Sequence, residues 1–72
     1  MEIGDIVVPD RVSEWRMAKA WENMVAICVD VENARFRIIC GKPDAWEHNE
    51  FTVFSHKVDS HLKVVGHAKV SP

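Results

Sequence analysis

Short runs of apolar residues, broken by proline, glycine and polar clusters, predict a chain built mainly from short β-strands. The first predicted strand runs from Glu2 to Val8, and Pro9 ends it because proline cannot donate to a strand ladder. Later in the chain we predict a strand over Phe51 to His56 and a last strand over His61 to Val70. Within the last strand, Gly66 marks a predicted bulge or bend.

One segment has a helical period instead. Four apolar residues follow the spacing i, i+3, i+4, i+7, which places them on one face of a helix: Met17, Ala20, Trp21 and Met24. Ser13 can cap this helix, and Glu14 suits its first turn because a negative charge is favourable there. The pattern therefore predicts a helix from Glu14 to about Asn23, with its apolar face packed on the sheet.

Residues 25–37 are predicted to form a β-hairpin around Asn33-Ala34, since Asn tolerates positive φ. The predicted register places opposite charges together on one face: Glu32 opposite Arg35 and Asp30 opposite Arg37. It places apolar residues together on the other face: Val31 opposite Phe36 and Val29 opposite Ile38. Cys28 and Cys40 then point to opposite faces, so we expect no disulfide between them.

The order of elements is a strand, a helix and four strands. This mostly β content, α+β when the helix is counted, suits a small five-stranded antiparallel barrel. The run Ile3-Gly4-Asp5-Ile6-Val7-Val8 resembles the first strand of SH3-like small barrels, and His61-Leu62-Lys63-Val64-Val65 is similar to their closing strand. The resemblance implies an SH3-like barrel with the helix inserted after its first strand. A flatter sheet with the helix on one side is the alternative.

Length limits the chain to one domain, which we assign to residues 1–72. Hydrophobic residues make up 47% of it, which is enough for one core with apolar surface left for a partner or a second copy. We identify no signal peptide and no apolar run of the roughly 20 residues that cross a bilayer, so no membrane partner is expected. The resemblance implies a bacterial or bacteriophage protein, and we expect a cytoplasmic location, in the bacterial host if a phage encodes it.

The net charge is −2, but its distribution is uneven. Residues 56–72 hold three Lys against one acidic residue, together with three of the four histidines. An unbroken last strand would align odd-numbered residues on one face. The candidate nucleic-acid contacts, including one neighbouring lysine, are Lys57, His61, Lys63, His67 and Lys69. Trp46 or Phe54 could stack on bases. A plain solvent-exposed edge strand is the favoured interpretation, because nucleic-acid binders are usually basic overall.

Trp15, Arg16 and Trp46 are the candidate contacts to a protein partner, because Trp and Arg are enriched where interfaces hold most tightly. Trp46 could equally be a lid over the open end of a barrel. The leading hypothesis is a non-catalytic protein-interaction module, an accessory or regulatory protein that docks on a larger protein. Nucleic-acid binding and self-association, through an apolar face or an unpaired strand, are the alternatives.

Catalysis and metal binding are not expected from the sequence. His56, His61 and Cys40 could approach one another, but their spacing matches no recognised zinc motif. A Cys–His nucleophile would need more concave volume than so small a barrel offers. The acidic residues could form a negative surface that mimics nucleic acid, but the net charge of −2 is much smaller than such mimics usually carry. We therefore predict no enzyme activity, no cofactor and no metal.

Overall fold

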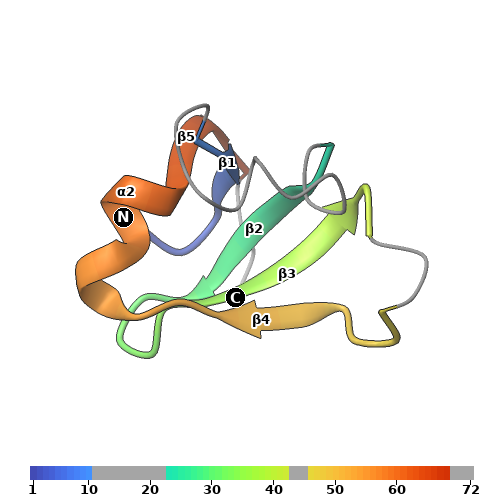
Figure 1. The fold of residues 1–72 in the computed structure, drawn as a ribbon. Helices are drawn as coiled ribbons and strands as arrows, with labels where there is room; N and C mark the ends of the chain where they lie inside the picture. Colours follow the sequence, from blue (N-terminus) through green and yellow to red (C-terminus); the bar gives the residue numbers. More distant parts are fainter. Residues whose placement is uncertain (11–22, 43–45, 69–72) are drawn as a thin grey trace.

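A computed structural model describes residues 1–10, 23–42 and 46–68 of the chain. They form one antiparallel sheet of five strands: β1 (Asp5–Pro9), β2 (Val25–Asp30), β3 (Arg35–Cys40), β4 (Glu50–Thr52) and β5 (Leu62–His67). The strand order is β4-β3-β2-β1-β5, and two short helical turns, η2 (Ser55–Lys57) and α2 (Val58–His61), lead into β5 (Figure 1). The mostly β, antiparallel class is thus confirmed. Over the described ranges β4 and β5 do not pair with each other, so the sheet is not closed.

The helix predicted from Glu14 to Asn23 lies outside the described residues, except for Asn23 itself, which is exposed in a turn. The helices that the structure does describe, η2 and α2, were not predicted. No helix in the described ranges is long and apolar enough to cross a membrane.

One face of the sheet carries the core. Burial alternates along β1 and through most of β3, as the two-residue period of a strand requires. In β3, Phe36 and Ile38 point inward while Arg35 and Arg37 remain exposed. The buried apolar residues are Val7, Met24, Ala26, Cys28, Ala34, Phe36, Ile38, Val53, Val58 and Leu62. Val58 of α2 thus packs in the same core as the buried residues of the strands, including Leu62 of β5.

The β2–β3 hairpin is confirmed, but its predicted register is wrong. The structure pairs Asp30 with Arg35 and Cys28 with Phe36, and the turn contains four residues, 31–34. The cause is the Asp30 side chain, which accepts hydrogen bonds from the backbone N–H of Asn33 at 3.2 Å and from its Nδ2 at 2.8 Å. These bonds enlarge the turn. Cys28 and Ala26, in place of Val31 and Val29, therefore share the buried face with Phe36 and Ile38. Both cysteines are free, as predicted.

The fourth strand is shorter than predicted. It ends at Thr52, which pairs with Arg35, the first residue of β3. Beyond Thr52 the neighbouring chain is no longer β3 but the hairpin turn that precedes it. One further hydrogen bond joins them, from Val53 N–H to Ala34 O at 3.1 Å. With no strand left to pair with, the chain turns helically through residues 55–61, although the predicted strand extended to His56.

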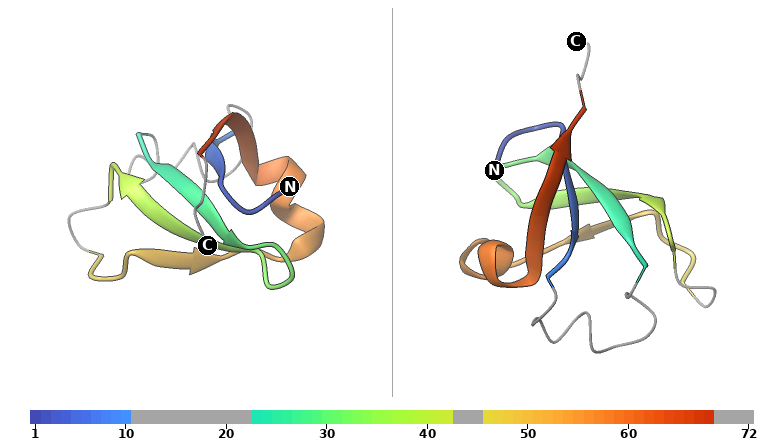
Figure 2. Two further views of the ribbon diagram at one scale, coloured as in Figure 1. Left: turned by 180° about the vertical axis from the view of Figure 1, so that it is seen from behind. Right: turned by 90° about the horizontal axis from the view of Figure 1, so that it is seen from above.

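The last strand lies beside β1, as the view from above shows (Figure 2). Its predicted start was wrong, since His61 belongs to α2 and the strand begins at Leu62. The predicted bulge is confirmed. Val64 pairs with Val7 and Gly66 pairs with Ile6, so Val65 is the extra residue on the bulged strand.

Candidate functional site

A groove of about 640 Å³ lies where the β2–β3 turn meets the chain that leaves β4. Its lining comes from residues 32–34 of the turn, residues 52–55, Lys57 and His61. Figures 1 and 2 show the turn and the helical segment side by side at this end of the sheet. We call this feature the hairpin groove. A smaller pocket of about 230 Å³ adjoins it and shares Ala34 and Ser55 with it.

Backbone hydrogen bonds fix the walls of the hairpin groove. Val53 N–H donates to Ala34 O, which joins the two walls at the floor. Lys57 N–H donates to Phe54 O at 2.7 Å and closes the turn of η2. The Ser60 hydroxyl donates to Lys57 O at 3.0 Å. Because backbone groups hold these segments, the groove is formed before any ligand enters it.

Phe54 is the most exposed large apolar side chain among the described residues, at 77%. It lines the hairpin groove, and its ring stacks on His56 with centroids 5.8 Å apart. An exposed Phe is far more informative than an exposed small apolar residue, because aromatic rings bury the most area on binding. The sequence pattern did not place Phe54 at a groove, because it predicted Phe54 to lie within a strand. In the structure that strand, β4, ends two residues earlier.

The structure separates the candidate nucleic-acid contacts. Lys57 and His61 line the hairpin groove. Lys63 pairs with Val8 whereas His67 pairs with Asp5, and the bulge at Val65 places these two side chains on opposite faces of the sheet. The single basic face predicted for the last strand is therefore wrong over the described residues. Lys69 lies outside them.

Trp46 is half-buried and packs against the core, with its ring centroid 6.4 Å from that of Phe51 and 5.9 Å from that of His48. In this position Trp46 covers the edge of the core and is only partly available to contact a partner. Trp46 does not line the hairpin groove. Trp15 and Arg16, the other two candidate protein contacts, lie outside the described residues.

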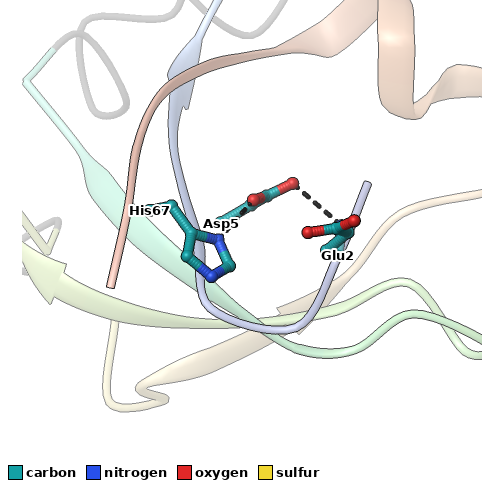
Figure 3. A group of neighbouring side chains, drawn as sticks. All are labelled: Glu2, Asp5 and His67. Carbon is teal, nitrogen blue, oxygen red and sulfur yellow. Dashed lines mark hydrogen bonds and ion pairs between the residues drawn. The ribbon is translucent and has the colours of Figure 1, made fainter. Parts of the chain in front are cut away.

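Three side chains from the two ends of the chain converge at the start of β1: Glu2, Asp5 and His67 (Figure 3). His67 Nδ1 lies 2.8 Å from Asp5 Oδ1, and the backbone N–H of Glu2 donates to Asp5 Oδ2 at 2.8 Å. The hydrogen bond from Glu2, and then that from His67, lowers the pKa of the Asp5 carboxyl below its ordinary value of 3.8. One possible ligand atom from each residue lies within 4.8 Å of the other two.

This is the one group of three or more potential metal ligands within the described part of the chain. His56, His61 and Cys40, which the sequence allowed as possible zinc ligands, do not form such a group within the described residues. Sequence reasoning missed Glu2, Asp5 and His67 because metal motifs are recognised by close spacing, whereas strand pairing brings these residues together from opposite ends.

The two cysteines differ in burial. Cys28 is buried in the core, and burial raises the pKa of its thiol, which disfavours the reactive thiolate. Cys40 is exposed on β3.

No protein-family model, curated protein or solved structure matches the chain. Function is therefore inferred from the geometry of the molecule itself.

Proposed function

We propose that this protein is a non-catalytic interaction module that binds a short peptide segment of a larger protein in the hairpin groove. The observation that carries the proposal is Phe54, which is 77% exposed at a groove of about 640 Å³. Exposing a large aromatic side chain to water is unfavourable, and a bound partner removes that cost. The volume falls within the roughly 300–1,000 Å³ typical of ligand sites.

The lining of the groove indicates the chemistry of the peptide. Ala34 and Val53 are buried at its floor and suit an apolar side chain that also contacts the Phe54 ring. Glu32 on the turn and Lys57 on η2 give the groove one charge of each sign. An extended peptide with a large apolar residue, and an acidic residue placed to reach Lys57, complements both features.

The SH3-like barrel remains part of this proposal. Three features support it: β5 lies beside β1, the first connection is long, and a hairpin follows it. An accessory role beside a larger bacterial or bacteriophage protein is what the resemblance implies, and a groove for a peptide segment suits that role.

A displayed library of random peptides, panned against the wild-type protein without counter-selection, tests the proposal, and each enriched peptide is then measured on the wild type and on the variants. We expect enriched peptides to shift the amide NMR signals of residues 32–34 and 53–57. Phe54→Ala and Lys57→Glu should weaken binding at least about tenfold, the effect of a loss of about 1.4 kcal/mol. Ile39→Ala is the matched control, because Ile39 is 55% exposed on β3 and does not line the groove. Peptides that bind Phe54→Ala as tightly as the wild type would overturn the proposal.

An NMR titration of the protein with a thymidine 12-mer tests nucleic-acid binding. Phe54, Lys57 and His61 would supply an aromatic platform and cationic groups to a single strand. Binding of the 12-mer that weakens steeply with salt, together with failure to enrich any peptide, would assign the groove to nucleic acid and refute a peptide partner.

A second candidate function is self-association through β5. Over the described residues β5 pairs with β1 alone, and it exposes 47% of Val64 and 55% of Val65. A long edge strand with apolar side chains is a template for pairing with another chain. Sedimentation of the wild type and of Val65→Lys would test this, since a dimer lost in the variant supports it and a monomer at high concentration refutes it.

A further inference from the structure

The cluster of Glu2, Asp5 and His67 combines two carboxylates with an imidazole. Asp5 is the one charged residue that is buried in the described part of the chain, with 9% of its surface exposed. Its carboxylate lies between the Glu2 side chain and the His67 ring (Figure 3). Burial of a carboxylate is costly unless cationic or hydrogen-bonding partners surround it. The backbone N–H of Glu2 and the ring of His67 supply such partners, and they favour the anionic form of Asp5 at this point.

One oxygen of each carboxylate and one nitrogen of the His67 ring lie within 4.8 Å of one another. The ring offsets one negative charge when it is protonated, and the amino group of Met1 adds a weaker favourable charge beside Asp5. A divalent cation would offset both charges and would also use the ring nitrogen as a ligand. This charge balance distinguishes the cluster from a simple Asp–His contact.

We propose that Glu2, Asp5 and His67 bind a divalent transition-metal ion, with Zn²⁺ as the ion to test. Imidazole nitrogen together with carboxylate oxygen is a donor set that Zn²⁺ accepts, whereas Mg²⁺ and Ca²⁺ prefer oxygen alone. Three protein ligands leave a coordination position for water. Binding through His67 Nδ1 replaces the hydrogen bond from that nitrogen to Asp5.

The present separations need only a small adjustment. Ligand atoms around a tetrahedral Zn²⁺ lie about 3.4 Å apart, given metal–ligand bonds of about 2.0–2.1 Å. The three candidate atoms already lie within 4.8 Å of one another. Glu2 is exposed and precedes β1, so rotation of its side chain can bring its carboxylate inward. The ion would then link the segment before β1 to the end of β5, in addition to the backbone bond from Ala68 N–H to Gly4 O at 2.8 Å.

Zn²⁺ titration of the untagged protein against a colorimetric chelator tests the site, with Glu2→Gln and His67→Ala as the informative variants. We expect one ion per chain and at least about tenfold weaker binding in each variant, because removal of even an outer-shell partner costs that much. Glu2→Gln keeps the backbone N–H that donates to Asp5, so its loss of affinity cannot be ascribed to misfolding. Thermal melts should show that Zn²⁺ raises Tm in the wild type and leaves Tm of His67→Ala unchanged.

His56→Ala and Cys40→Ser are the controls, because each removes an exposed potential ligand elsewhere. Both should bind Zn²⁺ like the wild type. The assignment would be refuted if Glu2→Gln and His67→Ala bound Zn²⁺ as tightly as the wild type. It would also be refuted if a control variant lost Zn²⁺ binding. Phe54→Ala should also retain the ion, so failure of the metal site and failure of the peptide groove can be told apart.

Discussion

The rings of Phe36 and Phe51 stack across the β3–β4 pair, with centroids 5.4 Å apart and planes inclined by 21°. Phe36 is fully buried, whereas Phe51 is half-buried at the margin of the core. This stack anchors the three-residue strand β4 to the hairpin. Because Phe54 follows β4 by only two residues, the anchored strand also positions the rim of the hairpin groove.

Phe36→Ala should therefore lower the free energy of unfolding by about 3–5 kcal/mol, the usual cost of deleting a buried ring. Phe54→Ala, the same change at a residue that is 77% exposed, should alter it by no more than about 0.5 kcal/mol. Urea denaturation followed by circular dichroism measures both. If Phe36→Ala does not fold, the milder Phe36→Leu should still lower the denaturation midpoint. A smaller loss for Phe36→Leu than for Phe54→Ala would contradict this core.

The hairpin shows what the sequence pattern could and could not predict. Strand propensity located β2 and β3, and two unbonded cysteines were expected. The register failed because the prediction matched charges across the strands, whereas the Asp30 side chain folds back on Asn33. Short polar side chains at a turn compete with cross-strand pairing, and here the local bonds set the turn length.

The groove and the acid–histidine cluster depend on distant contacts. Phe54 lies in a groove only because β4 runs out of partner at Arg35, and no local pattern marks that point. An irregularity was predicted near Gly66, but the basic face of the last strand was predicted for an unbroken strand without a bulge. One extra residue reverses every later side chain, and this reversal placed His67 against Asp5.

Gly41 is a second test of the fold, because it adopts a φ of 75° directly after β3. A Cβ at this position would overlap the backbone carbonyl of Asn23. Gly41→Ala should therefore reduce stability by more than about 1 kcal/mol. Gly66→Ala is the control, since its Cβ would meet only the Ile6 side chain at 3.8 Å or more. Thermal melts of the two variants compare them directly, and equal Tm values would argue against the close approach of Gly41 to Asn23.

The hairpin turn should be sensitive to acid through Asp30. Hydrogen bonds from the Asn33 side chain and then from its backbone lower the pKa of this carboxyl below 3.8. A lowered pKa means that the bonds stabilise the folded state above pH 3.8, and that this stabilisation disappears as the pH falls through the lowered pKa. In Asn33→Ala the main cause is removed, so the pKa should return toward 3.8. NMR titration of the Asp30 carboxyl carbon measures it, with Asp59→Asn as a control that should leave the Asp30 midpoint in place.

The two cysteines should differ sharply toward a thiol reagent. Cys40 is exposed on β3, whereas Cys28 is 1% exposed and burial raises the pKa of its thiol. Because the thiolate is the reacting species and the reagent must reach it, Cys40 should react quickly in the folded protein. Cys28 should react only as fast as β2 opens, and at once in urea. Cys40→Ser should abolish the fast phase, while Cys28→Ala should leave it intact. Two fast thiols in the native wild type would instead mean that the β2–β3 pair opens readily, and then the hairpin groove could not be a preformed site.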